Sequence, residues 1–309
     1  MMAFIKKLDW IWVDGKMVRW DDANEHVLAH TLHYGLGAFE GIRAYRRADG
    51  KTAIFRLSDH MQRLFDSCHI CTIDVPFTQD AVKEACVLVL RQNRLDQAYL
   101  RPIIYLGSGA MGLGATENPV RTVVAAYEWG AYLGEEGLRR GIRAKVSSFK
   151  RGAVDSVMTK GKICGQYVNS ILAKREAMKA GYDEAILLDR TGHVAEASGE
   201  NVFMVRKGAV WTAPTSSSIL AGITRDSTLR IARDLGYEVH ERVFTRDELW
   251  CADEVFLTGT AAEITPVREI DDRKVGPGEP GPVTRRLQDA FFDAVKGAKA
   301  RYPEWLTYV

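Results

Sequence analysis

Two lysines, Lys160 and Lys162, are the side chains of this sequence best suited to act as nucleophilic amines. They lie in the segment 159–167, which begins with Thr159 and ends with Tyr167. A lysine attacks a carbonyl group only when its amine is neutral, and a rigid, partly desolvated position at a strand end favours the neutral form. The even spacing puts both lysines on one face of such a strand, so the residues alone leave the choice between them open.

A second group of reactive side chains comes from the carboxylates of the segment 193–203. Apolar runs at 184–189 and 201–205, separated by a turn at 190–192, predict a β-meander in which Glu196 and Glu200 stand at strand ends. A carboxylate in this position is either a solvated turn residue or a functional group. The pattern alone leaves both readings open.

The meander carries a family signature. Its residues Glu196, Ser198, Asn201 and Phe203, followed by Thr212, resemble the signature of the class IV (fold-type IV) pyridoxal-phosphate aminotransferases. In that family the first glutamate faces the pyridine nitrogen of the cofactor. A carboxylate there keeps the nitrogen protonated, so the ring can accept the electron pair that the substrate Cα leaves when it loses its proton. The resemblance therefore implies pyridoxal 5′-phosphate as the cofactor.

The resemblance also separates the two lysines. The family places its Schiff-base lysine five residues before a tyrosine, and Lys162 with Tyr167 matches this spacing whereas Lys160 does not. Gln166 replaces the usual asparagine and Cys164 is a local variation. The match implies that Lys162 binds the cofactor covalently and carries the proton, and that Tyr167 donates a hydrogen bond to the phenolic oxygen of the cofactor.

The family further implies a set of phosphate contacts. Arg63 lies in an expected helix at 57–70, with Ser58 as its N-cap, in a run that resembles the family's arginine motif. A second expected helix, 225–235, follows a loop of small residues, and a helix start offers N–H groups to an anion. The expected cofactor contacts are Arg63, Lys162, Tyr167, Glu196, Leu220, Gly222, Ile223, Thr224 and Thr260.

The glycine-rich stretch 34–45 resembles the narrower branched-chain aminotransferase pattern Tyr-Gly…Phe-Glu-Gly-Ile-Arg. That group accepts both apolar branched side chains and glutamate, so an apolar box with one cation is expected, in which Arg101 binds the second carboxylate. The implied substrate-binding residues are Tyr34, Phe39, Gly41, Arg43, Tyr99, Arg101, Met111, Leu113, Trp129, Tyr132, Thr260, Ala261 and Ala262. Tyr34 and the 111–113 loop are expected from a neighbouring subunit, which makes a homodimer the minimum assembly and a homohexamer the alternative.

Other classes fit less well. The same fold hosts D-amino-acid aminotransferases, R-selective amine transaminases and aminodeoxychorismate lyases, but a D-alanine enzyme is expected to carry Arg-x-His where this chain has the run 99–101. The stretch 107–112 reads G-x-G-x-x-G, yet a strand rather than a helix is expected after it, which disfavours a dinucleotide site. His26, His30 and His33 lack cysteine or carboxylate partners at metal-ligand spacing.

The C-x-x-C at 68–71 falls at the end of the expected helix 57–70, whereas a redox pair is expected at a helix N-terminus. A redox or metal role for this pair is therefore disfavoured.

Composition sets the remaining limits. The 309 residues carry a formal charge of +2, which disfavours nucleic acid and membrane surfaces as partners. Five scattered cysteines favour the reducing cytoplasm. Together with the resemblance, the pattern predicts a two-domain α+β fold of the fold-type IV, D-amino-acid aminotransferase-like kind, with the cofactor in a cleft between the domains. The expected parts are a small domain at 1–130, a loop at 131–140 and a larger domain at 141–309.

Overall fold

The computed structural model describes residues 5–130 and 132–309. These residues form two compact units. The first contains Met1–Trp129, Gly161–Gln166 and Ala294–Val309, and the second contains Gly130–Lys160 and Tyr167–Asp293. This grouping differs from the single passage near 131–140 expected from the sequence, because the segment with Lys162 and the C-terminal residues group with the first unit.

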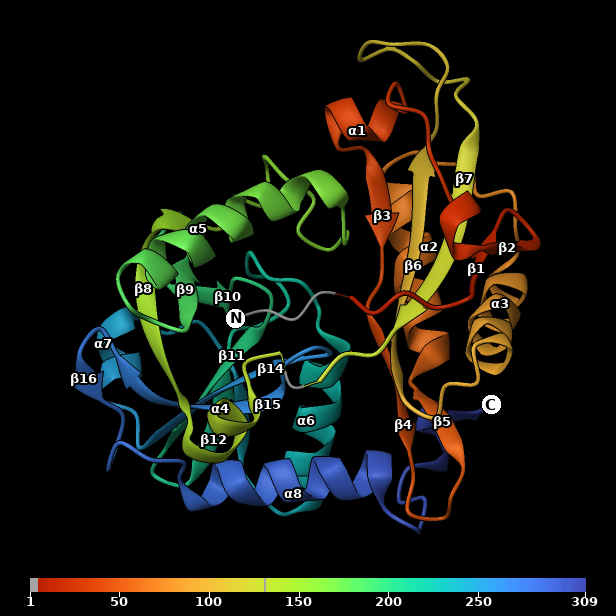
Figure 1. Ribbon diagram of the computed structural model, residues 1–309. Helices are drawn as coiled ribbons and strands as arrows, with labels where there is room; N and C mark the ends of the chain where they lie inside the picture. Colours follow the sequence, from red (N-terminus) through yellow and green to blue (C-terminus); the bar gives the residue numbers. More distant parts are fainter. Residues whose placement is uncertain (1–4, 131) are drawn as a thin grey trace. The chain divides into compact units, whose positions relative to one another are not determined.

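The first unit is built on an antiparallel sheet (Figure 1). Its strands are β1 (Trp10–Val13), β2 (Lys16–Arg19), β3 (Gly37–Phe39), β4 (Ile42–Arg46), β5 (Thr52–Phe55), β6 (Ala98–Leu106), β7 (Val120–Tyr127) and β17 (Leu306–Tyr308), in the order β17-β5-β4-β6-β7-β1-β2 with β3 beside β6. The β1–β2 hairpin turns at Asp14 and Gly15, which both have positive φ (46° and 88°), as a type I′ turn requires.

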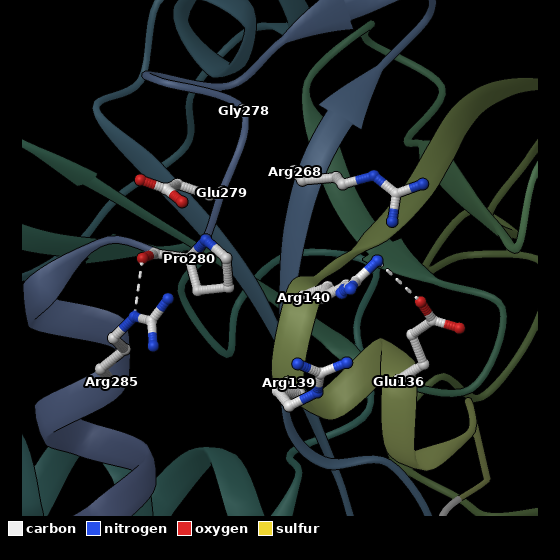
Figure 2. Close-up of a pocket in the computed structure, with 8 residues that line it drawn as sticks. All are labelled: Glu136, Arg139, Arg140, Arg268, Gly278, Glu279, Pro280 and Arg285. Atoms are coloured by element: carbon white, nitrogen blue, oxygen red, sulfur yellow. Dashed lines mark hydrogen bonds and ion pairs between the residues drawn. The ribbon is translucent and has the colours of Figure 1, made fainter.

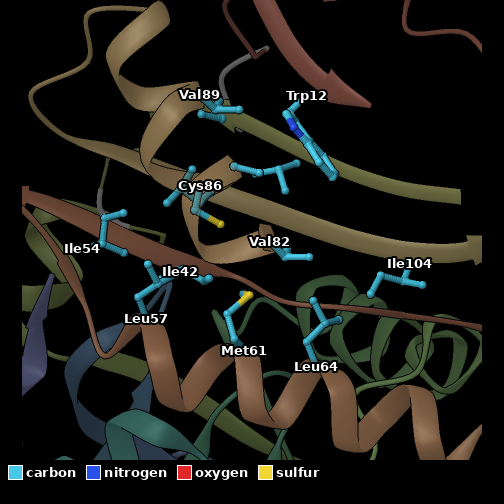
Figure 3. Packing of buried hydrophobic residues seen from close by; sticks show 14 of the residues in the cluster. Trp12, Ile42, Ile54, Leu57, Met61, Leu64, Val82, Cys86, Val89 and Ile104 are labelled. Atoms are coloured by element: carbon cyan, nitrogen blue, oxygen red, sulfur yellow. The ribbon is translucent and has the colours of Figure 1, made fainter. Parts of the chain in front are cut away.

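Two helices supply the core of the first unit. The helices of this unit are α1 (His30–Tyr34), α2 (Leu57–Ile70) and α3 (Gln79–Gln92), with 3-10 turns at Trp20–Asp22, Cys164–Gln166 and Pro303–Trp305. Leu57, Met61 and Leu64 recur at helical spacing on α2 and are fully buried against the sheet (Figure 3). The expected cap Ser58 is wrong: Arg56 is the N-cap of α2, in a left-handed conformation without a side-chain cap.

The second unit is a mixed sheet with helices around it. Its strands are β8 (Ile142–Lys150), β9 (Glu184–Leu188), β10 (Val194–Ala197), β11 (Asn201–Arg206), β12 (Ala209–Thr212), β13 (Val239–Glu241), β14 (Glu254–Gly259), β15 (Glu263–Ile270) and β16 (Arg273–Lys274). Its helices are α4 (Glu135–Arg140), α5 (Tyr167–Lys179), α6 (Ile223–Asp234), α7 (Arg246–Trp250) and α8 (Pro282–Lys296), of which the last three residues belong to the first unit.

The expected meander closes this sheet on itself. The strands follow the order β10-β9-β8-β15-β14-β11, and β10 also pairs with β11, so these strands form a ring. The pair that closes the ring is Glu196 opposite Asn201. Two residues of the family signature therefore stand where the ring closes.

Two further expectations can be compared with the structure. The expected loop 131–140 contains the short helix α4, so that part of the prediction is wrong. The segment 107–119 connects β6 to β7 without a helix, as expected. Because a dinucleotide fingerprint needs a helix to begin at its third glycine, this connection excludes that kind of site.

Within residues 5–130 and 132–309, no helix is long and apolar enough to span a membrane.

The start of α8 is held by a distant carboxylate. Glu254 on β14 accepts hydrogen bonds from the backbone N–H groups of Val283 (3.0 Å) and Thr284 (2.7 Å). We expect Glu254→Ala to lower the stability of the fold by about 2 kcal/mol, because it removes two hydrogen bonds that are each worth about 1 kcal/mol. Denaturant unfolding measures this loss. The exposed Glu279 offers the control, and an equal loss in Glu279→Ala would contradict the capping role.

A buried acid makes stability depend on pH. Burial and the neighbouring Glu184 carboxylate, which pairs with Lys174, raise the pKa of Glu200 to about 8. Unfolded glutamate releases its proton near pH 4.5, so the fold loses stability as the pH rises from there to about 8. Glu200→Gln imitates the protonated acid, and we expect its melting temperature to fall less than that of the wild type, by a few degrees, between pH 5 and pH 8. Differential scanning calorimetry decides this, and the exposed Glu84→Gln should follow the wild type.

Candidate functional site

Lys162 is fixed through its backbone. Its N–H donates to Ser67 Oγ (2.9 Å) on α2, and its carbonyl accepts from the N–H of Phe39 (3.1 Å) at the end of β3. The next residue, Ile163, forms an isolated bridge to Ala38. The Lys162 Nζ lies 5.1 Å from the centre of the Phe39 ring. The segment is therefore rigid, although it is not the strand that the sequence analysis expected.

Lys160 has a different environment in the second unit. Its ammonium group donates to the carbonyls of Ser217 (2.9 Å) and Ile219 (2.8 Å). Burial lowers its pKa, with the Glu196 charge opposing this shift. The idea that both lysines share one strand face is wrong, because residues 159–162 form turns and irregular backbone. The two lysines also belong to different units, and Lys160 holds the loop that precedes α6.

Arg63 is held by a buried carboxylate. Glu40 Oε1 accepts from Arg63 Nε (2.6 Å), and Glu40 Oε2 accepts from Arg63 Nη2 (2.9 Å). Glu40 also contacts His60 Nδ1 (2.7 Å), and both side chains are inaccessible to solvent. Burial acts to raise the pKa of Glu40, but the Arg63 charge and the hydrogen bonds from Arg63 and His60 outweigh it and hold this pKa well below its usual range. Sequence reasoning found Arg63 but missed its two partners.

Several expected substrate-binding residues form an aromatic cluster in the first unit. The rings of Tyr99 and Trp129 meet edge to face with centroids 4.6 Å apart. Tyr127, which sequence reasoning missed, lies within 5.7 Å of both ring centroids. A Cβ at Gly41 would lie 1.8 Å from the Tyr99 hydroxyl oxygen, so only glycine fits there.

Two arginines border this cluster. The Arg101 guanidinium carbon lies 4.9 Å from the centre of the Phe39 ring and 5.5 Å from that of Tyr99. Arg101 Nε is buried and has no hydrogen-bond partner in the described part of the chain. Arg43 donates to the carbonyl of Trp129 (3.2 Å). A partly buried cation with a buried, unmet Nε donor, bordered by aromatic rings, suits a carboxylate on an otherwise apolar ligand.

Three expected pocket residues are exposed in the isolated chain. Tyr34 is 42% exposed, Met111 44% and Leu113 91%. They belong to one end of the first unit, where His30 Nε2 contacts the carbonyl of Gly112 (2.9 Å). None of the described contacts joins them to the aromatic cluster of the same chain.

In the second unit, Glu196 is surrounded by donors. Arg151 Nη2 pairs with its Oε1 at 2.8 Å, and its Oε2 accepts from Asn201 Nδ2 (3.2 Å) and the Leu220 N–H (3.0 Å). Glu196 is only 5% exposed. Arg151 lies at the end of β8, far from Glu196 in sequence, and no local signal in the sequence points to it. An ionised carboxylate held in this way can face a protonated ring nitrogen.

The expected phosphate-binding loop leads into α6. Gly222 is the N-cap of this helix, so Ile223 and Thr224 occupy its first turn. The loop is fixed by Asn201, which donates to the carbonyl of Leu220 (3.0 Å). A Cβ at Gly222 would lie 2.0 Å from Asn201 Oδ1, which explains the glycine. The first N–H groups of a helix suit a phosphate group.

The remaining expected residues lie near the ends of β14 and α5. The segment of Thr260, Ala261 and Ala262 connects β14 to β15. Just before it, Thr258 Oγ1 is buried without a hydrogen-bond partner in the described chain. Tyr167 is the first residue of α5. The centre of the Tyr132 ring lies 5.3 Å from Lys174 Nζ. Taken separately, the donor sets fit parts of a phosphorylated pyridine: Arg63 in the first unit suits a phosphate, and the second unit offers helix N–H groups for a phosphate and the Glu196 carboxylate for a ring nitrogen.

The histidines and cysteines singled out earlier have structural partners. His30 and His33 contact backbone carbonyls at 2.9 Å, and His26 Nδ1 accepts from the Leu28 N–H. Cys68 and Cys71 belong to the core of the first unit. Burial raises the pKa of Cys68 to about 12 and that of Cys71 to about 11, so both thiols are poor nucleophiles at neutral pH.

A separate concave surface lies in the second unit (Figure 2). It measures about 610 Å³ and is lined by Arg139, Arg140, Arg268 and Arg285 among other residues. Arg140 pairs with Glu136 (3.1 Å), and Arg268 donates to the carbonyl of Gly141 (2.6 Å). None of the residues expected to bind cofactor or substrate lines this pocket, which contains exposed arginines with interleaved acids.

The chain matches known proteins over almost its entire length. Residues 37–270 match the model of the family described as amino-transferase class IV. The branched-chain-amino-acid aminotransferase of Pseudomonas aeruginosa is 50% identical, with 97% of each chain covered. That of Escherichia coli (strain K12) is 47% identical, with 98% of each chain covered.

Solved structures agree with these matches. The crystal structure of the Escherichia coli branched-chain amino acid aminotransferase has a TM-score of 0.95 at 47% identity, covering 97% of this chain and 99% of that one. The enzyme of the same name from Thermobaculum terrenum, solved in its PLP-form, has a TM-score of 0.91 at 36% identity, covering 98% of each chain. The expected fold and cofactor class are confirmed, and the chain belongs to the class IV aminotransferase family, among the branched-chain-amino-acid aminotransferases.

Proposed function

We propose that this chain catalyses reversible transamination between branched-chain L-amino acids and 2-oxoglutarate with pyridoxal 5′-phosphate. The products are branched-chain 2-oxo acids and L-glutamate, formed in two half-reactions. The observation that carries the substrate assignment is Arg101, a partly buried cation bordering the rings of Phe39 and Tyr99. An apolar wall favours leucine, isoleucine or valine, and the guanidinium favours the second carboxylate of glutamate. The relatives named above support the same reaction.

The proposed catalytic residues have separate roles. Bound pyridoxal phosphate supplies an electron-accepting ring conjugated to the substrate nitrogen. Lys162 holds the cofactor covalently and, once released, moves the proton at the substrate Cα; general acid–base help of this kind is worth about 10²–10⁴ in rate. Glu196, which forms an ion pair with Arg151 (2.8 Å), keeps the ring nitrogen protonated. Tyr167 donates to the phenolic oxygen.

The phosphate and the substrate carboxylates are bound by separate groups. Arg63, Thr260 and the N–H groups of the segment 222–224 are proposed for the phosphate. The α-carboxylate is proposed to meet the backbone of residues 260–262. The remaining pocket residues, which enclose the substrate side chain, are Tyr34, Phe39, Gly41, Arg43, Tyr99, Arg101, Met111, Leu113, Trp129 and Tyr132.

The proposal includes a homodimer as the minimum assembly. Tyr34, Met111 and Leu113 are then contributed by the neighbouring subunit, which is supported by their exposure in the isolated chain and by that of Val27 (73%) and Leu32 (68%) at the same end. Light scattering tests the assembly, since a monomeric active enzyme would contradict the dimer.

We also propose the cytoplasm as the compartment, which is supported by the described cysteines, all of which are free.

We expect Lys162→Ala to abolish the absorption band of the lysine-linked cofactor and to lower kcat by about 10²–10⁴-fold or more. Lys160→Ala is the matched control, because its amine is bound to two carbonyls and should be needed only for stability. Absorption spectra before and after addition of L-leucine, then of D-alanine, provide the readout. A normal band in Lys162→Ala would refute the lysine assignment, and a response to D-alanine alone would move the protein to a sister family.

We expect Arg101→Leu to lower kcat/KM for L-glutamate by about 100-fold, because the second carboxylate loses its only proposed cation in an apolar setting. L-leucine serves as the internal control and should lose less than about 10-fold. Half-reaction kinetics with each amino acid measure both values in one preparation. Equal losses would show that Arg101 supports the fold of the pocket rather than the recognition of glutamate.

A further inference from the structure

We propose that Glu40 is a positioning residue that orients the guanidinium of Arg63 for the cofactor phosphate, at a fixed place relative to Lys162. This inference rests on the proposed role of Arg63 in binding that phosphate. It gives a function to a buried carboxylate that stands in the pattern at 34–45 and has no role in the proposed chemistry.

The contacts of Glu40 are directional. Its carboxylate meets the Nε and Nη2 side of Arg63 at 2.6 and 2.9 Å, so the planar guanidinium is held by two parallel hydrogen bonds. Arg63 is 13% exposed while Glu40 is fully buried. A side-on pair of this kind fixes the plane and the direction of the guanidinium.

His60 completes the arrangement without adding charge. Burial lowers the pKa of His60, so its ring is neutral at pH 7. Because the ionised Glu40 can only accept hydrogen bonds, the proton of the neutral ring lies on Nδ1, 2.7 Å from Glu40 Oε2. The backbone N–H of Gly41 adds a weaker contact at 3.3 Å. Both oxygens of Glu40 therefore accept hydrogen bonds, and the carboxylate cannot rotate without losing a partner.

The same helix fixes the lysine. Ser67 lies one turn after Arg63 on α2, donates to the Arg63 carbonyl (2.7 Å) and accepts from the Lys162 N–H (2.9 Å). Glu40 follows β3, whose last residue, Phe39, donates to the Lys162 carbonyl. The phosphate anchor and the Schiff-base lysine are thus tied to the same helix and the same strand. A buried ion pair adds little net stability compared with apolar packing, which fits a role in geometry.

The substitution Glu40→Gln tests the proposal because it keeps the shape and removes two acceptor positions. If the amide nitrogen replaces Oε2, His60 can change tautomer and accept from it, but Arg63 Nη2 loses its partner. If the amide nitrogen replaces Oε1, Arg63 Nε loses its partner. Either arrangement releases one side of the guanidinium.

The experiment measures the affinity of the apoenzyme for pyridoxamine 5′-phosphate, which cannot bond covalently to Lys162, and the ³¹P NMR resonance of the bound phosphate. We expect Glu40→Gln to weaken binding about 10-fold or more and to shift the resonance. His60→Asn is the matched control, because the asparagine amide can donate in place of Nδ1 and leaves the Arg63 pair intact. It should resemble the wild type in both readouts.

Arg63→Lys separates this inference from the proposed function. If Arg63→Lys weakens binding while Glu40→Gln behaves like the wild type, Glu40 has no positioning role and the phosphate role of Arg63 stands. If Arg63→Lys itself leaves affinity and resonance unchanged, the role of Arg63 fails and the inference fails with it. Should Glu40→Gln not fold, Glu40→Asp keeps the charge but withdraws the oxygens, and wild-type values in that variant would overturn the proposal.

Discussion

A carboxylate remains ionised inside a protein only when cations and N–H donors surround it, and this constraint organises the residues around both Glu40 and Glu196. Each of these residues is at most 5% exposed and forms an ion pair with an arginine from a distant part of the chain. Arg63 comes from α2 and Arg151 from the end of β8. Neither glutamate could tolerate the loss of its arginine without protonation or a change of conformation.

The same constraint extends to the backbone around each carboxylate. Glu196 accepts a hydrogen bond from the N–H of Leu220. Asn201, which pairs with Glu196 where the ring of strands closes, donates to the carbonyl of Leu220. The loop before α6 is therefore held in place by the residues that surround the ring-nitrogen carboxylate. In the first unit, Ser67 connects the helix turn that carries Arg63 to the backbone of Lys162. In each unit, the groups proposed to bind the phosphate and those proposed to react are held by the same hydrogen-bonded residues, so these bonds fix their spacing within the unit.

Local patterns in the sequence predicted most of the regular structure because the forces behind them are local. The Asp14–Gly15 turn, the apolar face of α3 and the meander around Glu196 all follow from φ preferences and residue periodicity within a few positions. The Ser58 cap and the strand at Lys160 failed because tertiary contacts override such preferences. Arg151, His60 and Glu40 were missed as partners because they meet their targets only after β8, α2 and β3 have packed. Resemblance supplied the roles of Lys162 and Glu196, which periodicity could not.

If Arg101 has its proposed role, its position explains how one pocket can treat two unlike side chains in a similar way. A cation in a purely aliphatic box would be left without a partner whenever a branched-chain substrate was bound, at a cost of several kcal/mol. Here the guanidinium lies within 4.9–5.5 Å of the centres of two aromatic rings, whose faces attract a cation. Those rings partly satisfy Arg101 when the substrate is apolar and leave its buried Nε for a carboxylate when the substrate is glutamate. The aromatic composition of the box is therefore as important for substrate choice as its size, because it lowers the energy difference between the two occupied states.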